Sequence, residues 1–270
     1  MNSLVSITVP NLDTKQLNWF LKTNWQVLNL DITKGRLELI IASSADPKLL
    51  KPIQRRYPKL RIINLKLKSV GFAKTVNAGF RQVDKGALWL GTVNDDVALP
   101  RRWLTNLIKA INEMKMIGSI NPVIVNLKLK NVESAGIEVL PIGRAVPITQ
   151  VPEKPTLVDA TNAACVLYNA QALKKVGFFD ERFESYLEDI DLSLRLKRAG
   201  YKNIVVPGVV VYHLKHTTSQ KTLTSKRRAW LNLRNWWYIL LKNWSLKTWL
   251  RHLLGILLER GRNFSGWLKV

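Results

Sequence analysis

Short, uninterrupted apolar runs alternate with amphipathic stretches along the N-terminal part of the chain, and this alternation restricts the class of fold. The runs are LVSITV at 4–9, LELIIA at 37–42, LRIINL at 60–65 and ALWLGTV at 87–93. Between the first two, apolar residues recur at helical spacing, namely Leu17, Phe20, Leu21, Trp25 and Leu28. Further helices are expected near 46–56, over 72–83 and after Pro100. Continuous apolar strands that alternate with helices are typical of a parallel sheet covered on both faces, so we predict an α/β fold.

In such a sheet, ligands bind beyond the carboxyl ends of the strands. The segments at those ends lie around Pro10, Ser43, Gly71 and Asp95. We therefore expect the binding site along this edge.

The regular alternation lapses after residue 117. Short strands and hairpins are expected at INPVIV, IEVLP and AVPITQVP, with four prolines between 141 and 155. VDATNAACVLY reads as a strand leading into the helix of AQALKKV, and KNIVVPGVVVYH at 202–213 reads as a strand that ends on His213.

An acidic cluster in GFFDERFESYLEDIDLSLRLKRAG, residues 177–200, stands out in a chain whose net charge is +23. Glu188, Asp189 and Asp191 open a helix there. Acidic residues in a first helical turn are favoured by the helix dipole, and Asp191 is placed to pair with Arg195 four residues on. A carboxylate held rigidly at a helix start is also suited to act as a general base. The sequence leaves both interpretations open.

A second acidic group, Asn94-Asp95-Asp96, follows the fourth predicted parallel strand. NDD is a common turn sequence, because Asn and Asp side chains bond to their own backbone. Two carboxylates at a strand end also suit a divalent cation that carries substrate phosphates. His213 could add an imidazole ligand, which Mn²⁺ tolerates better than Mg²⁺, although a structural histidine is an open alternative and His216 is a competitor.

Charge and composition restrict the classes of partner and the cellular compartment that we expect for this protein. A net charge of +23 and a pI of about 10.3 indicate a polyanionic partner: nucleic acid, an anionic membrane or a phosphorylated substrate. The single cysteine, Cys165, lies in an apolar run, so a buried structural thiol in a reducing compartment is expected. Neither a signal peptide nor an apolar stretch of membrane-spanning length is apparent, so we expect a cytoplasmic protein.

The C-terminal part, 215–270, is rich in tryptophan and basic residues and reads as amphipathic helices. Such helices suit the interface of an anionic membrane. The predicted contacts are Trp236, Trp237, Arg227, Arg228 and Arg234. Packing of the helices on the core with a solvated basic face is the competing interpretation. A nucleic-acid-binding protein that uses the same tail is the alternative from another functional class.

Several motifs together resemble one enzyme family. VSITVP, GFAKTVNAGF at 71–80, NDDVALP at 94–100, GFFDERF at 177–183, EDIDLSLRLKRAGY at 188–201 and the strand ending in His213 occur in the order and approximate spacing of family 2 glycosyltransferases. The resemblance covers residues 4–214 and is greatest to bacterial rhamnosyltransferase-like members.

This resemblance implies a GT-A fold that binds a nucleotide-diphosphate sugar and transfers the sugar with inversion, using Mn²⁺ or Mg²⁺. By the likeness, Asp96 is a metal-binding acid, Asn94 and Asp95 lie near the ribose and metal, His213 is a metal ligand, and Asp189 is the catalytic base with Glu188 beside it. Pro10 would lie against the nucleotide, and Gly71, Lys74 and Asn77 would flank the diphosphate and sugar. Many relatives carry an Asp after the second strand to read the base, where this chain has Ile41, Ala42, Ser43 and Ser44, which leaves the donor base open.

The expected organisation is a catalytic domain at 1–214 and a basic, Trp-rich helical extension at 215–270. We expect a glycosyltransferase at the inner face of the plasma membrane that acts on a lipid-linked or cell-surface polysaccharide acceptor. Breaking the sugar–phosphate bond leaves an anionic diphosphate that a divalent ion stabilises, while a carboxylate removes the proton of the acceptor hydroxyl.

Overall fold

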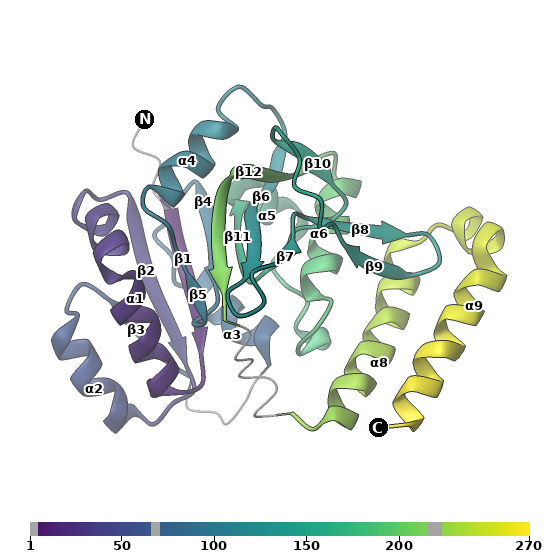
Figure 1. The fold of residues 1–270 in the computed structure, drawn as a ribbon, viewed down its shortest axis with the longest axis horizontal. Coiled ribbons are helices and arrows are strands. Elements are labelled where there is room, and N and C mark those ends of the chain that lie inside the picture. Colours follow the sequence, from purple (N-terminus) through teal and green to yellow (C-terminus); the bar gives the residue numbers. More distant parts are fainter. Residues whose placement is uncertain (1–4, 66–70, 215–222) are drawn as a thin grey trace.

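The computed structural model describes residues 5–65, 71–214 and 223–270, and its centre is one large sheet (Figure 1). Eight strands follow the order β10-β12-β6-β11-β4-β1-β2-β3, with β5 paired to β12 and β7 paired to β6. These strands are β1 (Val5–Asn11), β2 (Leu37–Ser43), β3 (Arg61–Asn64), β4 (Trp89–Val93), β5 (Val97–Ala98), β6 (Ile117–Asn126), β7 (Val132–Ser134), β10 (Thr156–Val158), β11 (Cys165–Asn169) and β12 (Lys202–His213). A separate hairpin joins β8 (Ile137–Leu140) to β9 (Arg144–Pro147).

The first half of the sheet is parallel, as the alternation predicts. β1 pairs parallel with both β2 and β4, and β2 pairs parallel with β3. The register sets Pro10 beside Ala42 and Asn11 beside Ser43. The carboxyl ends of β1 and β2 therefore meet at one edge. β11 runs antiparallel between β4 and β6, and β12 runs parallel to β6.

Helices cover both faces of this sheet. They are α1 (Thr14–Thr33), α2 (Pro47–Arg56), α3 (Phe72–Phe80), α4 (Trp103–Ala110), α5 (Ala170–Val176), the 3₁₀ turn η1 (Glu181–Phe183) and α6 (Glu188–Arg198), followed by α8 (Ser225–Asn243) and α9 (Leu246–Leu268). One core cluster joins α1, α2 and α4 to one face, and a second joins α3, α5 and α6 to the other. Adjacent residues of β4 alternate between them: Trp89 belongs to the first cluster and Leu90 to the second.

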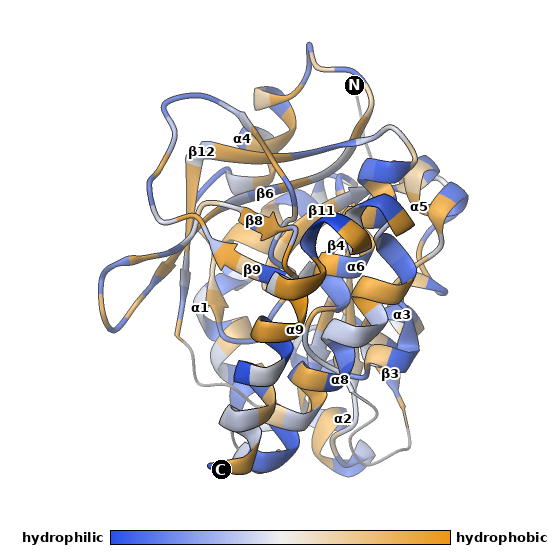
Figure 2. Ribbon diagram, turned by 90° about the vertical axis from the view of Figure 1, so that its right-hand side faces the viewer, coloured by the Kyte–Doolittle hydropathy of each residue, from blue (hydrophilic) through white to orange (hydrophobic). Residues whose placement is uncertain are grey.

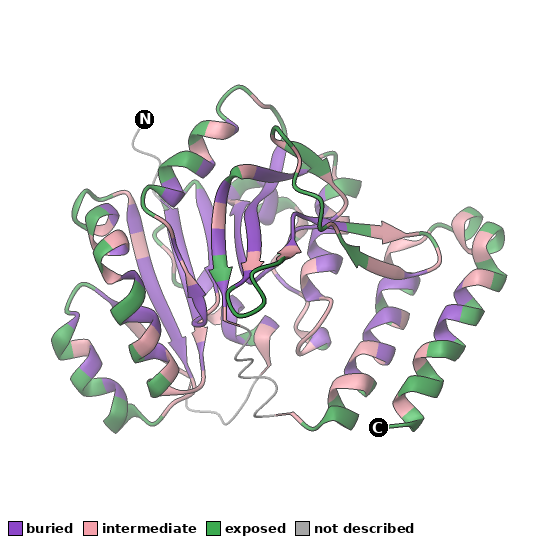
Figure 3. Cartoon of the chain, in the orientation of Figure 1, coloured by how far each residue is buried: buried purple, intermediate pink, exposed green. Residues whose placement is uncertain are grey.

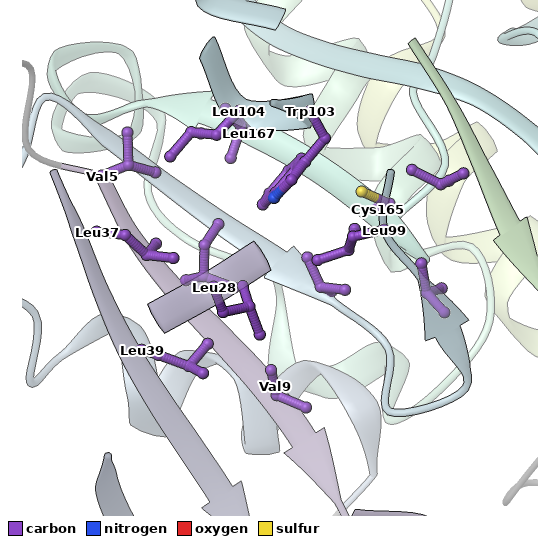
Figure 4. Close-up of a cluster of buried hydrophobic side chains, with 14 of the residues drawn as sticks. Val5, Val9, Leu28, Leu37, Leu39, Leu99, Trp103, Leu104, Cys165 and Leu167 are labelled. Carbon is purple, nitrogen blue, oxygen red and sulfur yellow. The ribbon is translucent and has the colours of Figure 1, made fainter. Parts of the chain in front are cut away.

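The first cluster fixes the register of the strands that end at the candidate site. Val5 and Val9 of β1, Leu39 of β2 and Trp103 of α4 lie in it (Figure 4). Cys165 is fully buried in the same cluster, and burial raises the pKa of its thiol, so it is a structural residue as expected.

Glycine permits one close contact between a helix and this sheet. A Cβ atom on Gly79 of α3 would lie 2.3 Å from Oγ1 of Thr8 in β1. Only glycine allows α3 to approach β1 this closely, which brings the N-terminus of α3 toward the carboxyl ends of the strands.

The predicted α/β class is confirmed, but one predicted strand is wrong in extent. VDATNAACVLY was expected to be continuous, whereas only Thr156–Val158 and Cys165–Asn169 are strands. The side chain of Asn162 accepts a hydrogen bond from the N–H of Ala164 at 2.9 Å, and Ser193 Oγ accepts one from the N–H of Thr161 at 3.2 Å. These side-chain bonds replace ladder bonds and turn the chain before β11.

The C-terminal helices lie side by side at one end of the molecule (Figure 1). Trp236 and Ile239 of α8 pack with Phe183 and Ile190 in a third core cluster. α9 is tied to the β8–β9 hairpin by an ion pair between Arg144 and Glu259 and by Arg260, which donates to the carbonyl of Gly143. Among the residues that the structure describes, no helix is long and apolar enough to cross a membrane.

Candidate active site

Polar side chains from three parallel strands meet at the edge where β1, β2 and β4 end. Asn11 donates from Nδ2 to Asp95 Oδ2 at 2.6 Å, and Ser43 donates from Oγ to Asn11 Oδ1 at 2.9 Å. All three side chains are buried. The strands place these groups at the predicted edge, and Asn11 links the segment around Ser43 to the acidic turn.

Asp95 has an unusual environment for a carboxylate. Burial raises its pKa, the hydrogen bond from Asn11 lowers it, and the charge of Asp96 raises it again, giving a pKa of about 7. The side chain of the neighbouring Asn94 also has a buried Oδ1 without a hydrogen-bond partner. Buried polar groups left in this condition are uncommon and indicate a place for a ligand or an ion.

Asp96 and His213 are direct neighbours, although they are 117 residues apart in sequence. The short strand β5, which follows Asp96, pairs with the end of β12, and Val97 lies opposite His213. Nε2 of His213 lies 3.0 Å from Asp96 Oδ1, and Nδ1 lies 3.1 Å from Glu133 Oε2. Burial lowers the pKa of His213, but the hydrogen bonds to Asp96 and Glu133 outweigh burial and raise it to about 9.

The donor set of Asp96 and His213 fits a divalent cation that is completed by a ligand. Within residues 5–65, 71–214 and 223–270, no three His, Cys, Asp or Glu side chains are grouped in a way that could hold a metal ion. Metal ions that carry phosphates commonly need only one or two protein ligands, because phosphate oxygens and water supply the others. A carboxylate beside an imidazole suits Mn²⁺, and the second carboxylate on His213 orients the ring as it does for metal-bound histidines.

The second acidic group, at the start of α6, is buried. Asp189 Oδ2 accepts a hydrogen bond from the N–H of Ala163 at 3.1 Å, and Oδ1 accepts one from the N–H of Ile190 at 2.9 Å. Burial raises the pKa of Asp189 despite these bonds. Glu188 has an Oε2 without a hydrogen-bond partner, and burial together with the charge of Asp189 raises its pKa well above the usual range. Both carboxyl groups therefore hold protons more tightly than ordinary surface acids.

One short segment contacts both acidic groups. The N–H of Ala163 donates to Asp189, while the carbonyl of Ala164 accepts from the N–H of Asn94 at 2.8 Å. Asn94 and Asp96 belong to the same turn. The fold thus brings the NDD turn and the start of α6 to the two sides of residues 163–164.

Asp191 has the structural role that its spacing suggests. Its Oδ2 accepts from Arg195 Nε at 2.8 Å and from Lys242 Nζ at 3.0 Å. Arg195 also donates to the carbonyls of Val176 and Phe178, at 2.6 and 2.7 Å. This interpretation is correct for Asp191, whereas Glu188 and Asp189 have no such partner in the residues that the structure describes.

The loop before α6 is strained. Glu184, Tyr186 and Leu187 have φ values of 61°, 72° and 67°. A left-handed conformation costs a residue other than glycine about 1–2 kcal/mol, so the surroundings must hold the loop in place.

The residues predicted to flank the donor diphosphate separate into two groups. Gly71 has φ 80° at the N-cap of α3, and a Cβ there would meet the carbonyl oxygen of Glu184 at 2.6 Å. Lys74 is exposed on the first turn of α3. Asn77, however, is buried, and Nδ2 donates to Phe179 O and Glu181 Oε1 at 2.8 and 3.0 Å. Both N–H donors of Asn77 therefore hold the chain at 179–181.

Two of the residues predicted to contact a membrane, Trp236 and Arg234, face the protein in the structure. Trp236 is only 4% exposed, because it packs into the third core cluster. Arg234 donates to Glu184 Oε1 at 2.8 Å and to the carbonyls of Arg182 and Phe183 at 2.9 and 3.1 Å. Its charge is therefore directed into the protein.

The other predicted contacts lie nearer the surface. Arg227 pairs with Glu184 at 2.9 Å, Arg228 donates to the carbonyl of Leu223 at 2.8 Å, and Trp237 stacks on Trp249 with ring centroids 6.4 Å apart. His216 and the start of the predicted extension at 215 lie outside the described residues.

Two residues of this site, Asn11 and Glu133, were not selected from the sequence. Asn11 follows Pro10 at a strand end and could have been found by the rule that selected Asn94. Glu133 lies in a region that reads as irregular loop, and only the pairing of β7 with β6 brings it to His213.

Comparison with protein families gives one match over most of the chain. A family described as "Glycosyltransferase like family 2" matches residues 35–232. A curated relative, the N-acetylglucosaminyl-diphospho-decaprenol L-rhamnosyltransferase of Mycobacterium tuberculosis, is 40% identical over 60 residues. That match spans 22% of this chain and only 20% of the length of the relative.

Solved structures are similar over nearly the whole chain at low sequence identity. GalNAc-T7 with UDP, GalNAc and Mn²⁺ has a TM-score of 0.68 at 14% identity, covering 88% of this chain and 48% of that one. The mannosyltransferase PcManGT from Pyrobaculum calidifontis with GDP-Man and Mn²⁺ has a TM-score of 0.63 at 15% identity, covering 98% and 73%. TarS from S. aureus with UDP-GlcNAc has a TM-score of 0.63 at 17% identity, covering 95% and 72%. At these identities the likeness establishes a shared fold, which is GT-A.

Proposed function

This chain belongs to glycosyltransferase-like family 2, and from that premise we propose that it moves a sugar from a nucleotide-diphosphate sugar to an acceptor hydroxyl with inversion of the anomeric centre. The observation that carries the proposal is the pair of acidic groups on either side of residues 163–164. One group lies at the carboxyl edge of the parallel strands and suits a cation with a diphosphate. The other group is a buried carboxyl pair suited to proton transfer.

Asp189 is the proposed general base. Its carboxylate is fixed by two backbone N–H groups, so it points in one direction and does not need to reorganise when a hydroxyl arrives. The raised pKa makes it a better proton acceptor than a surface aspartate. As Asp189 takes the proton, the hydroxyl oxygen bonds to the anomeric carbon on the face opposite the diphosphate and the bond to the diphosphate breaks. This single displacement inverts the anomeric centre without a covalent enzyme intermediate.

Asp96 and His213 are the proposed ligands of Mn²⁺ or Mg²⁺, with Asp95 and Asn94 beside them. Two of the similar structures hold Mn²⁺ together with a nucleotide or a nucleotide sugar. When bound, such an ion neutralises the charge that develops on the leaving diphosphate. Asn11, Ser43 and Pro10 stand at the strand ends where a nucleoside would lie, and Gly71 and Lys74 open the helix that faces the phosphates.

The proposed acceptor is lipid-linked or a cell-surface polysaccharide. The name of the curated relative includes N-acetylglucosaminyl-diphospho-decaprenol, which is a lipid-linked molecule. We further propose that residues 1–214 form the catalytic unit and that 215–270 form an extension bound peripherally to the inner face of the plasma membrane.

A basic, apolar surface on α9 supports the membrane location. The outward side of α9 exposes Leu246, Leu250, Leu253, Leu254, Leu257, Leu258, Phe264 and Leu268. Lys247, Arg251, Arg262 and Lys269 are exposed beside this stripe, and at about 100° of rotation per residue they fall along one border of it. An apolar stripe with a basic border suits the headgroup region of an anionic bilayer better than a nucleic acid, which calls for stacking rings.

A binding screen followed by a transfer assay tests the proposed reaction. The protein is heated with UDP-, GDP- and dTDP-sugars in the presence of Mn²⁺ or Mg²⁺, and the donor that stabilises it is then used for transfer to prenyl-diphosphate-linked and polysaccharide acceptors. We expect metal-dependent stabilisation by one donor class and a product of inverted anomeric configuration. Stabilisation by single-stranded nucleic acid and by none of the donors would refute the assignment.

Two variants separate the roles at this site. Asp189→Asn should abolish transfer while it retains donor binding, and Asp96→Ala should lose the metal dependence of donor binding. Normal turnover of Asp189→Asn would exclude that residue as the base, and unaltered metal dependence of Asp96→Ala would exclude it as a ligand.

A further inference from the structure

The strained loop at 182–187 is held by two adjacent residues of α8, Arg234 and Asn235. Asn235 is fully buried, and Nδ2 donates to the carbonyls of Phe183, Ser185 and Tyr186 at 2.9, 2.9 and 2.8 Å. An amide has only two N–H donors, so one of them is shared between two of these oxygens.

Arg234 completes the same arrangement. It donates to the carbonyls of Arg182 and Phe183, and its Nε and Nη2 donate to Asn235 Oδ1 at 3.1 and 3.0 Å. The guanidinium thereby fixes the orientation of the amide, so that the N–H side of Asn235 faces the loop. Of the other two carbonyls of the segment, that of Glu184 accepts from the N–H of Ala73 in α3 at 3.0 Å, and that of Leu187 accepts from the N–H of Asp191 in α6 at 3.0 Å.

This loop determines where α6 begins. Tyr186 and Leu187 are left-handed, and Leu187 is the N-cap of α6, immediately before Glu188 and Asp189. A change of either φ value toward the ordinary range would redirect the chain at the point where the two carboxyl groups emerge. Strained residues persist only where neighbouring groups determine their conformation. Here those groups are the side chains of Arg234 and Asn235 in α8, which donate hydrogen bonds to the carbonyls of the loop.

We propose that Arg234 and Asn235 are positioning residues that hold the left-handed residues of the 182–187 loop in place and so aim Asp189, with Glu188 beside it, at the acceptor hydroxyl. The consequence for catalysis rests on the proposed function, whereas the consequence for the loop does not. The C-terminal helices would then be part of the catalytic apparatus, because α8 sets the geometry of α6.

The test compares Asn235→Asp with wild type. This variant keeps the shape of the side chain and removes its N–H donors, and Asn235→Ala and Arg234→Lys serve as second variants if it does not fold. Asn263→Ala is the matched control, because Asn263 donates to a carbonyl of its own helix, that of Glu259, at 2.6 Å.

The first readout is amide hydrogen exchange, which needs no substrate. We expect exchange over 183–191 to rise about tenfold or more in Asn235→Asp, with α1 to α4 unchanged, since loss of these bonds allows the segment to open locally. Asn263→Ala should exchange like wild type over 183–191. Wild-type exchange in this segment of folded Asn235→Asp would overturn the proposal.

The second readout separates kcat from KM, with the donor found in the sugar-nucleotide screen and Mn²⁺. Misplacing a catalytic group by about 1 Å can cost a hundredfold in rate, so we expect kcat to fall by about that factor while the KM for the donor stays within threefold of wild type. A loop that opens without any change in kcat would overturn the positioning role. An inactive wild-type protein would refute the proposed function and would leave the exchange experiment to decide the structural claim.

Discussion

At the scale of single residues, Glu188 and Asp189 form a buried pair of carboxyl groups in a strongly basic chain. Both groups have raised pKa values because burial disfavours their charged forms. The pKa of Glu188 is raised further by the charge of Asp189. We expect Asp189 to lose its proton first as pH rises, with Glu188 neutral beside it, because the charge of Asp189 disfavours ionisation of Glu188.

This order predicts the acidic limb of the pH profile. The proposed reaction requires ionised Asp189, so kcat should decline as pH falls through a value above the ordinary aspartate pKa of about 3.9. Glu188→Gln mimics the neutral form of Glu188, and we expect that limb to stay in place. The profile of kcat against pH is the measurement. A limb that shifts downward in Glu188→Gln would mean that Glu188 is charged during turnover and repels ionisation of Asp189.

At the scale of secondary-structure elements, α8 is attached to α6 and to the turn before it by charged contacts. Lys242 Nζ lies 2.7 Å from Asp180 Oδ2 and 3.0 Å from Asp191 Oδ2. Asp180 also accepts from Arg182 at 2.6 and 2.9 Å. The hydrogen bonds from Arg182 lower the pKa of Asp180, burial opposes them, and the contact with Lys242 lowers it further. One carboxylate thereby joins η1 to the C-terminal helices.

The lowered pKa of Asp180 predicts how the contacts between η1 and α8 respond to acid. A depressed native pKa means that the unfolded chain binds the proton more readily. The stabilisation is thus fully present above the unfolded pKa of about 3.9 and is lost as pH falls below it. Asp180→Asn should cost about 2 kcal/mol at neutral pH, and the difference from wild type should shrink toward pH 2–3.

Denaturant unfolding at a series of pH values measures this effect. Asp159→Asn is the control, because its partner Lys197 is 59% exposed and such surface pairs contribute less than about 1 kcal/mol. If the free energy of unfolding of Asp180→Asn stays below that of wild type by a constant amount down to pH 2, the loss of stability arises from packing and not from charge.

At the scale of the whole molecule, the exposed apolar surface is concentrated at one end. α8 is buried along the side that faces the core, whereas α9 is largely exposed (Figure 3). Apolar residues of α9 form patches on the side of the molecule turned to the viewer in Figure 2. The proposed membrane contact through α9 would leave α8 in place against the strained loop at 182–187, so one helical pair could serve both proposed purposes.

This arrangement predicts which residues govern vesicle binding. Leu250→Glu combined with Leu254→Glu should abolish flotation with phosphatidylglycerol vesicles, because both side chains are about 70% exposed on the apolar stripe and would bring charge into the bilayer interface. Binding of wild type should weaken with added salt and with neutral lipid, since part of it comes from basic residues. The control is Leu129→Glu, an equally exposed leucine beyond the end of β6.

The two outcomes of the flotation experiment are distinct. Loss of binding in the α9 double variant, with normal binding of Leu129→Glu, locates the contact on α9. Equal flotation of both variants would contradict an apolar contact through this face. Trp236 is only 4% exposed, so we do not expect it to take part in this contact.

Local chemistry in the sequence was enough to predict the class of fold and the types of residue at the site. Strand and helix periodicity, turn-forming Asn and Asp, and acid at a helix start all act within a few residues, so the alternation, the NDD turn and the opening of α6 could be read directly. The edge at which Asp95 and Ser43 meet followed from the rule that parallel strands end together.

The partners of polar groups far apart in the sequence were decided by tertiary structure. His213 meets Glu133 across 80 residues, and Asn235 meets the carbonyl of Tyr186 across 49. No local pattern encodes such contacts, because they depend on which strands pair and which helix covers which face. Composition alone therefore did not decide whether Arg234 faces lipid or protein. In the structure α8 packs against the strained loop, and Arg234 faces the protein, where it bonds to Glu184 and to the carbonyl of Arg182.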